Sequence, residues 1–298
     1  RARLPHVSTV DDAVALLAKC SKVVVLTGAG VSTSLGIPDF RSKGTGLYAM
    51  IQDAGIDGVH EPEEVFDVRV FREEPEVFYG VAPMLLSKLD VTPSVAHRWV
   101  AALEARGKLL RNYTQNIDGL EVSAGVTRVV QCHGTLATSS CTRCGSKVPT
   151  SAIVPTVMAG GVPVCQRCPK RVGSRAVMKP DIVFFHETLP ATFQNQILGD
   201  AAAADLFVVM GSSMKVKPVS TMISHLPPHV PVVLINREPL STRHAFDVEL
   251  LGNCDPIVAE LGRRLGWEEV APPPGVQPVA CTTPHPHQFL FPGGVLPD

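Results

Sequence analysis

The sequence predicts an α/β fold: a doubly wound, Rossmann-like parallel sheet into which a smaller domain, made of a zinc ribbon and helices, is inserted. Short apolar runs alternate with segments of helical spacing along most of the chain. This alternation is typical of β-α-β units, whose parallel strands are covered by helices on both faces. Two cysteine pairs and one further helical stretch interrupt the alternation, which indicates an insertion rather than an appended module.

Runs rich in Val, Ile, Leu and Phe predict the buried strands. They are Lys22–Thr27, Leu109–Thr114, Ile182–Phe185, Leu206–Met210 and Val232–Asn236. Helical spacing or composition predicts helices over Val10–Ala18, Ser94–Ala105 and Ala191–Ala204. We therefore assign the parallel-sheet domain, in three pieces, to residues 10–44, 81–134 and 181–268.

The other segments do not follow this alternation of strands and helices. Residues 45–80 are expected to form a helical insertion of the smaller domain, and residues 135–180 its metal-binding module. Residues 269–298 are rich in proline and read as a C-terminal tail. Its apolar segment Gln288–Phe291 is expected to dock on the edge of the sheet as an added strand.

Four cysteines have the spacing of a zinc ribbon: Cys141-x2-Cys144 and Cys165-x2-Cys168, with 20 residues between the pairs. Each pair can direct two sulfurs at one ion, and two pairs complete a tetrahedral shell that suits Zn²⁺. Because no coordination position is left open, the single ion is expected to be structural. Chance thiol pairs, or a redox Cys-x2-Cys, are the alternatives.

Composition excludes some classes of protein. The chain has 298 residues, a formal net charge of −1 and 45% hydrophobic residues. No run approaches the roughly 18 apolar residues that cross a bilayer, so no membrane association is expected. The remaining cysteines lack the spacing of a disulfide framework, which favours a reducing compartment. Because the chain begins with Arg1, we expect it to be an excised fragment without its targeting region.

Charge is unevenly distributed along the chain. Residues 135–179 contain seven Lys or Arg and no acidic residue. This excess fits either a solvated metal module or a docking surface for nucleic acid or an acidic partner, and direct nucleic-acid binding is not established by it. Residues 53–76 contain nine acidic residues against Arg69 and Arg72. This acidic stretch could steer basic peptides toward the protein.

A glycine turn, Gly28-Ala29-Gly30, follows the first predicted strand. Such a turn lets the backbone approach a pyrophosphate, which the N-terminus of a following helix would also favour. The usual G-x-G-x-x-G is not met, because Thr33 occupies the third glycine position. No acidic residue ends an obvious second strand, which disfavours a conventional hydride-transferring dehydrogenase.

Longer motifs carry a resemblance to a known family. Residues 28–48 read GAGVSTSLGIPDFRSKGTGLY, residues 113–121 YTQNIDGLE and residues 131–135 QCHGT. Further along come KPDIVFF at 179–185, MGSS at 210–213, LINREPL at 234–240 and FDVELLGNCD at 246–255. In this order they closely resemble the sirtuins, the NAD-consuming protein lysine deacylases. The amino-acid sequences of these motifs are most similar to those of the nuclear, silencing-type class I branch, with mitochondrial and cytoplasmic class I relatives as the alternative.

The resemblance implies NAD as a consumed co-substrate, held by backbone amides and side chains at the ends of the strands. Asp118 would receive the nicotinamide carboxamide, and Tyr48 would belong to a mobile loop that closes over the cofactor. The implied contacts are Gly28, Ala29, Gly30, Ser32, Asp39, Phe40, Arg41, Tyr48, Gln115, Asn116, Ile117, Asp118, Gly211, Ser212, Ser213, Asn236, Arg237, Glu238 and Cys254.

The resemblance also implies the catalytic and substrate-binding residues. His133 would be the general base that activates a ribose hydroxyl, since a group with a pKa near 6.5 can take a proton at neutral pH. Asn116 would assist in catalysis. The acyl-lysine stem would lie in an apolar tunnel lined by Phe40, Val183 and Phe185, and the peptide backbone would pair with His186 and Glu187. The family usually has glycine at the position of His186, so the peptide preference of this chain is open.

The implied function is NAD-dependent protein lysine deacetylation. Acetyl-lysine peptides or proteins, histone tails among them, would be the partners, with chromatin partners possible and the nucleus favoured over cytoplasm or mitochondrion. A mono-ADP-ribosyltransferase, or a deacylase of longer neutral acyl groups, is the alternative. A silent scaffold would be expected to lose His133, Asn116 or Asp118, and all three are present.

Overall fold

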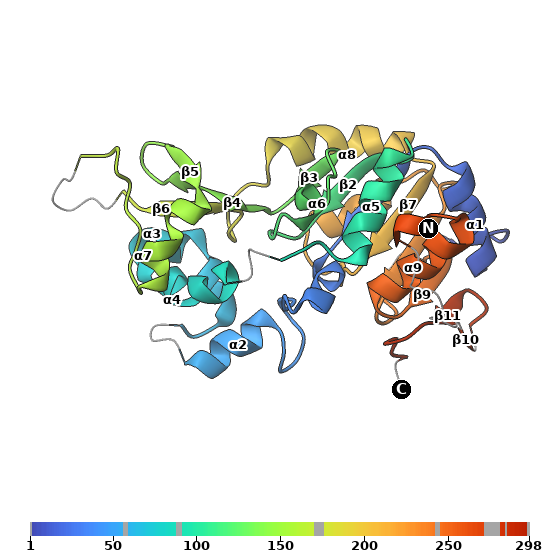
Figure 1. Ribbon diagram of the computed structural model, residues 1–298, viewed down its shortest axis with the longest axis horizontal. Helices are drawn as coiled ribbons and strands as arrows, with labels where there is room; N and C mark the ends of the chain where they lie inside the picture. Colours follow the sequence, from blue (N-terminus) through green and yellow to red (C-terminus); the bar gives the residue numbers. More distant parts are fainter. Residues whose placement is uncertain are drawn as a thin grey trace.

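The computed structural model describes residues 2–55, 59–87, 91–169, 176–241, 245–270, 281–283 and 285–296. They form a large lobe around a long sheet and a smaller lobe beside it along the long axis of the molecule (Figure 1). Residues 271–280 of the predicted tail lie outside the described residues, as do Lys170, Arg171 and Arg175 of the basic stretch.

The large lobe is built on an eight-stranded sheet of order β10-β11-β9-β8-β7-β1-β2-β3. All neighbours pair in parallel except β10 and β11, which are antiparallel. This confirms the predicted fold class. The strands are β1 Val23–Thr27, β2 Leu109–Thr114, β3 Val129–Gln131, β7 Leu206–Met210, β8 Val232–Asn236, β9 Val248–Leu251, β10 Cys281–Thr282 and β11 Gln288–Leu290.

Helices of the large lobe begin where the sequence offers caps. Thr9 and Ser94 each form a capping box, with Asp12 and His97 respectively, so helices start directly after them. The α-helices are α1 Val10–Lys19, α5 Val95–Ala105, α6 Leu120–Ser123, α8 Ala191–Ala203 and α9 Cys254–Leu265, which confirms the three predicted helices. The 3₁₀ segments are η1 Ala29–Val31, η2 Thr33–Leu35, η5 Val219–His225 and η6 Glu268–Val270.

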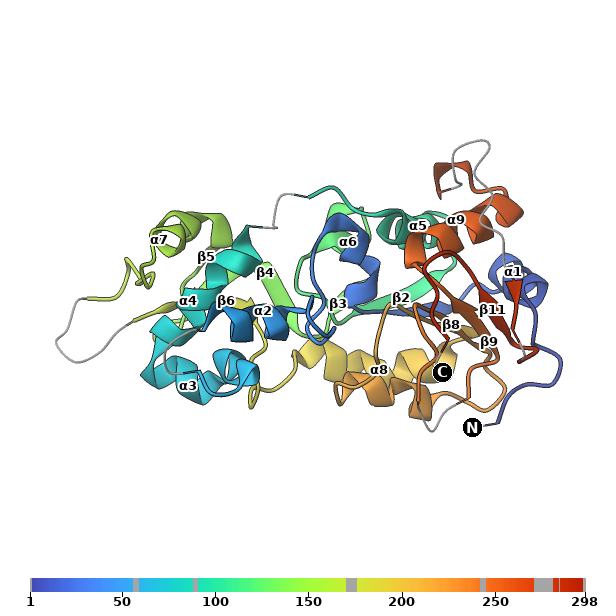
Figure 2. The same ribbon diagram turned by 90° about the horizontal axis from the view of Figure 1, so that it is seen from below.

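Alternate residues of the parallel strands pack on opposite faces of the sheet. In β1, Val23 and Val25 belong to a core formed with α1, α5 and α9, whereas Val24 and Leu26 belong to a core formed with α8 and η5. Both groups are fully buried, so the strand carries no polar face. Figure 2 shows α5 and α9 on one side of the sheet and α8 on the other.

The smaller lobe combines helices with a three-stranded antiparallel sheet of order β5-β4-β6. Its core includes Phe66, Phe71, Phe78 and Phe184, whose rings meet mostly edge to face at 5.1–6.1 Å between centroids. The elements are α2 Leu47–Ala54, η3 Pro62–Phe66, α3 Val68–Glu73, α4 Pro75–Leu86, β4 Gly134–Cys141, β5 Lys147–Pro149, η4 Thr150–Ala152, α7 Val154–Met158 and β6 Met178–Ile182.

One predicted strand and two boundaries are wrong. The strand expected over Ile182–Phe185 does not form: only Ile182 belongs to a strand, as the last residue of β6, which pairs with β4 in the small sheet and not with the parallel one. Ile182 and Phe184 pack in the core of the smaller lobe, so the parallel-sheet domain does not resume at residue 181. The helical insertion passes residue 80, because α4 continues to Leu86 and buries Val81 and Leu86 in the same core.

The described part of the tail follows the edge of the large sheet. β11 pairs in parallel with β9, and the N–H of Val295 donates to the carbonyl of Arg237 at 2.9 Å. Both chain ends lie on the large lobe (Figure 1). Among the described residues, no helix is long and apolar enough to cross a membrane.

The strand order reverses between β1 and β7. From β1 the sheet grows through β2 to β3, and the chain then returns to add β7, β8 and β9 on the other side. In open parallel sheets, ligands bind beyond the carboxyl ends of the strands at such a point. The loops that follow β1 and β7 should therefore border the site.

Candidate active site

A cavity of about 1660 Å³ lies beyond the ends of β1 and β7 and extends to the smaller lobe. All the residues that the sequence suggested for cofactor, catalysis and substrate line it. They are Gly28, Ala29, Gly30, Ser32, Asp39, Phe40, Arg41, Tyr48, Gln115, Asn116, Ile117, Asp118, His133, Val183, Phe185, His186, Glu187, Gly211, Ser212, Ser213, Asn236, Arg237, Glu238 and Cys254.

Two glycine loops interlock at the floor of this cavity. The N–H of Gly28 donates to the carbonyl of Met210 at 3.0 Å, and that of Gly30 to the carbonyl of Gly211 at 2.8 Å. A Cβ on Gly30 would lie 2.6 Å from the Cα of Gly211, and Gly211 has φ +62°. Larger residues cannot fit between the two loops, which therefore pack backbone against backbone beside the cavity. The expected helix does not follow; the chain makes the short segments η1 and η2 instead.

A hydrogen-bonded cluster of polar side chains follows β2. Asn116 donates through Nδ2 to the carbonyl of Gly28 and to Ser32 Oγ, both at 3.2 Å. Ser32 Oγ in turn donates to Asp118 Oδ2 at 2.8 Å. Asn116 and Ser32 are buried, so these bonds form in a poorly solvated environment that fixes the side chains.

His133 stands at the end of β3 with one ring nitrogen fixed and the other free. Its Nδ1 lies 2.9 Å from the carbonyl oxygen of Gln115, an acceptor, so Nδ1 carries the proton. Nε2 is buried and has no hydrogen-bond partner within the described residues. Burial lowers the pKa of His133 below its ordinary value. The ring is therefore neutral at pH 7, with an unused lone pair on the buried Nε2.

The loop that follows the glycine turns is closed by Asp39. Asp39 Oδ1 accepts the N–H groups of Arg41 and Ser42, at 2.8 and 2.6 Å. The Arg41 guanidinium lies 5.4 Å above the ring of Tyr48, a cation–π distance. Burial raises the pKa of Tyr48 to about 12, so this phenol stays neutral.

Polar residues from β7, β8 and α9 form the opposite end of the cavity. Ser212 Oγ donates to Gln115 Oε1 at 2.6 Å, which joins the loops after β7 and β2. Asn236 donates to the carbonyl of Glu238 at 2.9 Å. Cys254 begins α9, and burial raises the pKa of its thiol to about 12, so it is an unreactive neutral group.

The side of the cavity toward the smaller lobe is apolar. Phe40 meets Tyr48 and Phe66 edge to face, at 5.8 and 5.9 Å between centroids. The N–H of Val183 donates to the carbonyl of His133 at 2.8 Å, so this wall is fixed directly to the catalytic candidate. Ile117, Leu136 and Ile182 also line this side.

His186 has a left-handed backbone conformation, φ +69°. Glycine adopts this region freely, whereas a side chain there costs about 1–2 kcal/mol. The ring is held outside the cavity floor, with Nε2 2.8 Å from an Arg69 nitrogen and 3.4 Å from Asp67 Oδ2. Hydrogen bonds from Arg69 hold the pKa of Asp67 below its usual range. The contact with α3 thus accounts for how this position tolerates a histidine.

Glu187 is oriented by its neighbours. Its Oε2 accepts from Lys179 Nζ at 2.9 Å and from the N–H of Phe184 at 2.8 Å. Lys179 also lies 4.2 Å above the ring of Phe184. The carboxylate is therefore already paired and does not act as a free charge toward a ligand.

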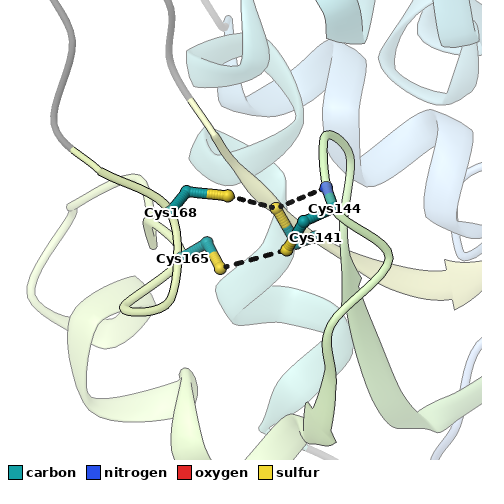
Figure 3. A group of neighbouring side chains, drawn as sticks. All are labelled: Cys141, Cys144, Cys165 and Cys168. Atoms are coloured by element: carbon teal, nitrogen blue, oxygen red, sulfur yellow. Dashed lines mark hydrogen bonds between the residues drawn. The ribbon is translucent and has the colours of Figure 1, made fainter.

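The four predicted cysteine ligands lie together at one end of the small sheet, with all four sulfurs within 4.8 Å of one another (Figure 3). Sγ–Sγ distances of 3.8 Å separate Cys141 from Cys168 and Cys144 from Cys165. A tetrahedron with Zn–S bonds of about 2.3 Å has edges of about 3.8 Å. The thiols form no disulfide, and the donor set fits one structural Zn²⁺ ion. None of the four lines the large cavity.

Comparison with known proteins agrees with this geometry. A family model described as "Sir2 family" matches residues 28–218. The chain belongs to the Sir2 family. The matched segment contains the glycine loops, Asn116, Asp118, His133 and all four cysteines.

Curated relatives extend the Sir2-family match over most of the chain. The NAD-dependent protein deacetylase sirtuin-1 of Rattus norvegicus is 47% identical over 268 residues, covering 90% of this chain and 47% of the relative. The NAD-dependent histone deacetylase SIR2 of Kluyveromyces lactis is 41% identical over 303 residues, covering 90% and 44%. The chain thus spans about half, or less, of the length of these relatives.

A solved Sir2 structure shares the fold. It is described as "Structural Basis for the Mechanism and Regulation of Sir2 Enzymes" and superposes with a TM-score of 0.71 at 31% identity. The match covers 87% of this chain and 96% of that one. The likeness therefore includes both lobes of the Sir2 fold.

Two residues beside this Sir2-family site were not found by sequence reasoning, and neither of them lines the cavity. Buried His97 and Glu121 lie with the half-buried Asp118, and one nitrogen or oxygen atom of each is within 4.8 Å of the other two. Glu121 accepts from Thr27 Oγ1 at 2.8 Å, while its Oε2 has no partner within the described residues. Burial first, and then the charge of Asp118, raises the pKa of Glu121 to about 7. A Glu three residues after Asp118 in a short helix was the available signal.

The raised pKa predicts a pH-dependent stability difference for Glu121→Gln. Between the ordinary pKa of 4.5 and about 7, the folded chain holds a proton that the unfolded chain has released. The contribution of Glu121 to stability is therefore present below pH 4.5 and is lost as the pH rises through 7. Since glutamine stays neutral, the free energy of unfolding of the variant relative to the parent should increase by a few kcal/mol from pH 5 to pH 8. Denaturant titrations at four pH values test this, with exposed Glu73→Gln as the control; a pH-independent difference would contradict it.

Proposed function

We propose that this protein is an NAD-dependent protein lysine deacetylase, which transfers the acetyl group of acetyl-lysine to ADP-ribose and releases nicotinamide. The observation that carries the proposal is the position of His133. His133 lines the cavity together with the polar cluster of Asn116 and Asp118 and with Val183 of the apolar wall, and its buried Nε2 has no hydrogen-bond partner within the described residues. A neutral base at such a boundary can accept a proton from a polar co-substrate while an apolar acyl chain lies beside it.

The residues present fit NAD. Gly28, Gly30 and Gly211 line the cavity as a backbone cradle without side chains, which suits close approach of a pyrophosphate. Asn236, Glu238 and Cys254 line the cavity and would border the adenosine, whereas Asp118 and Ile117 would border the nicotinamide. When bound, NAD supplies the electrophilic ribose carbon and the ADP-ribose acceptor of the acyl group.

The protein side of the chemistry follows from the contacts. The Gln115 carbonyl keeps the proton of His133 on Nδ1, so Nε2 accepts a proton from a hydroxyl brought to it. That proton transfer makes the imidazolium, which the same carbonyl stabilises. Asn116 and Ser32 hold Asp118 in place, and the aromatic wall around Phe40 excludes water from the acyl group. The zinc ion would hold the small sheet in shape and take no part in the reaction.

Names of relatives support the substrate class. Relatives in Kluyveromyces lactis and in Drosophila melanogaster are called histone deacetylases, whereas those of mammals and HST1 of Saccharomyces cerevisiae are called protein deacetylases. Acetylated histones, or other acetylated proteins of the nucleus, are therefore the proposed substrates.

Mass spectrometry of the reaction products tests the proposal. Protein, NAD and an acetyl-lysine peptide should give free lysine peptide, nicotinamide and acetyl-ADP-ribose in equal amounts. A peptide or protein that gains the mass of ADP-ribose would instead identify a mono-ADP-ribosyltransferase. Absence of nicotinamide release would contradict both functions.

The apolar wall predicts the acyl preference. No Lys or Arg occurs between Gly44 and Ile51, and Phe40, Val183 and Phe185 offer no charge to pair with a carboxylate. Because an unpaired carboxylate is costly to bury, succinyl-lysine should react at least about tenfold more slowly than acetyl-lysine in the same peptide. Comparing kcat/KM for acetyl, butyryl and succinyl versions tests this. Equal or faster succinyl removal would rule out the apolar tunnel.

A further inference from the structure

One buried carboxyl group beside the cavity has no part in the proposed reaction. Glu121 is 1% exposed and does not line the cavity, whereas Asp118, three residues earlier, does. One oxygen of each of these carboxyl groups lies within 4.8 Å of the other and of a ring nitrogen of His97. Carboxyl groups this close influence each other's ionisation. The charge of Glu121 therefore acts on the same end of the cavity as that of Asp118.

The hydrogen bonds to the two carboxyl groups come from neutral donors. Asp118 accepts from Ser32 Oγ at 2.8 Å and from the N–H of Leu120 at 3.0 Å. Glu121 accepts through Oε1 from Thr27 Oγ1 at 2.8 Å, and its Oε2 has no partner within the described residues. Neither carboxyl group forms an ion pair in the described part of the chain. A second negative charge at this place is therefore left without a cation of the protein.

The histidine of the cluster does not supply the missing positive charge. Nδ1 of His97 accepts the N–H of Ser94 at 3.2 Å, while Ser94 Oγ donates to the carbonyl of Val31 at 2.9 Å, so the ring proton is on Nε2. Burial lowers the pKa of His97, although the charges of Asp118 and Asp255 oppose this effect. The imidazole is therefore neutral at pH 7.

The charge of Glu121 itself changes near neutral pH. Burial first, and then the charge of Asp118, raises its pKa to about 7. Cys132, which follows β3 and faces Glu121, stays protonated because burial raises the pKa of its thiol far above the ordinary value. His133 is already neutral, since burial lowers its pKa. A neutral solution thus contains both the protonated and the ionised form of Glu121.

A cationic ligand at this end of the cavity would shift that balance. The nicotinamide ring of NAD carries a positive charge, and Asp118 is proposed to border it. A nearby opposite charge favours the ionised form of a carboxyl group. Bound NAD should therefore lower the pKa of Glu121, and the proton should pass to the buffer. The positive ring then takes the place of the proton, so the net charge of the cluster does not change.

We propose that Glu121 releases its proton when NAD binds, and so places a second negative charge beside the cationic nicotinamide ring. This rests on the proposed function, because it assigns a residue to the co-substrate site of that reaction. Glu121 acts through its charge and is not a catalytic residue, since it does not line the cavity. For a pKa that falls by roughly 0.5–1 unit, NAD should bind about two- to fivefold more tightly at pH 8 than at pH 6.

Calorimetric titration measures the proton release without turnover. NAD is added to the parent protein at pH 7 in phosphate and in Tris, whose heats of ionisation differ, and the difference in binding enthalpy gives the protons released. About 0.3 proton per NAD is expected for the same fall in pKa. ADP-ribose, which has no cationic ring, should release none. In Glu121→Gln, NAD should release none either, whereas exposed Glu73→Gln should match the parent.

Steady-state kinetics with a saturating acetyl-lysine peptide give a second readout. The KM for NAD should fall with rising pH in the parent and in Glu73→Gln, and should stay level in Glu121→Gln. Equal proton release with NAD and ADP-ribose, none with NAD, or the same release in Glu121→Gln would overturn the inference. The comparison of the two ligands uses the unaltered chain, so it decides even if the variant does not fold. If NAD binding is found neither by calorimetry nor as saturation of turnover, the proposed function fails as well.

Discussion

Replacing His133 by alanine is expected to lower kcat/KM for deacetylation by about 10²–10⁴-fold, the usual loss when a general base is removed. The reason is geometric. The Gln115 carbonyl fixes the Nδ1 proton, so the buried and unpartnered Nε2 is the basic atom. Binding of NAD should survive, because the cradle of Gly28, Gly30 and Gly211 is untouched. Steady-state rates give the first quantity, and the shift in Tm on adding NAD gives the second.

The pH profile supplies an independent readout of His133. Burial lowers the pKa of its imidazole, and only the neutral ring can accept a proton. Activity should therefore be full at neutral pH and fall as the pH drops through that lowered pKa. Exposed His229→Ala serves as the control and should keep both rate and profile. Near-normal turnover in His133→Ala would exclude the proposed mechanism.

Replacing Cys141 by serine is expected to release zinc and to destabilise the smaller lobe by several kcal/mol, since metal binding and folding are coupled. Cys141 is the right position to change because it is buried at the end of β4, and its Sγ accepts the N–H groups of Arg143 and Cys144. Metal content by elemental analysis and thermal unfolding measure the two effects. Cys20→Ser, in the large lobe, should retain one zinc ion per chain.

Activity should also fall in Cys141→Ser, but through loss of structure. The small sheet leads directly into the apolar wall, since β6 ends at Ile182 and the next residue, Val183, bonds to the carbonyl of His133. Because no cysteine ligand lines the cavity, binding of NAD to the large lobe should weaken less than turnover. A metal-free variant with full stability and full activity would contradict a structural zinc site.

The sequence predicts much of the large sheet, for a simple physical reason. β1, β7 and β8 are five residues long and fully buried, so they appear as apolar runs, and the six residues of β2 begin with two leucines. β3 and β9 are shorter, and β9 includes Glu249, so no such run marks them. Ile182–Phe185 is equally apolar but packs in the other lobe, and composition does not tell one core from another.

The residues of the site likewise fall into those that the sequence predicts and those that only the structure reveals. Motifs identified the residues that surround the cavity, because each motif is local in the chain. The cluster of His97, Asp118 and Glu121 joins α5 to the segment after β2, so only the folded chain reveals it. The helix expected after Gly30 fails because Gly36 and Pro38 follow too soon for more than short 3₁₀ segments.

The docking of β11 changes where a minimal enzyme can end. Val295 lines the cavity and is held to the Arg237 carbonyl, beside residues proposed to face adenosine. A chain shortened to Val270 would lose this piece of wall and would leave β9 as an open sheet edge, a surface prone to self-association. Residues 288–295 are thus expected to be needed for full activity, although they contribute no reacting group.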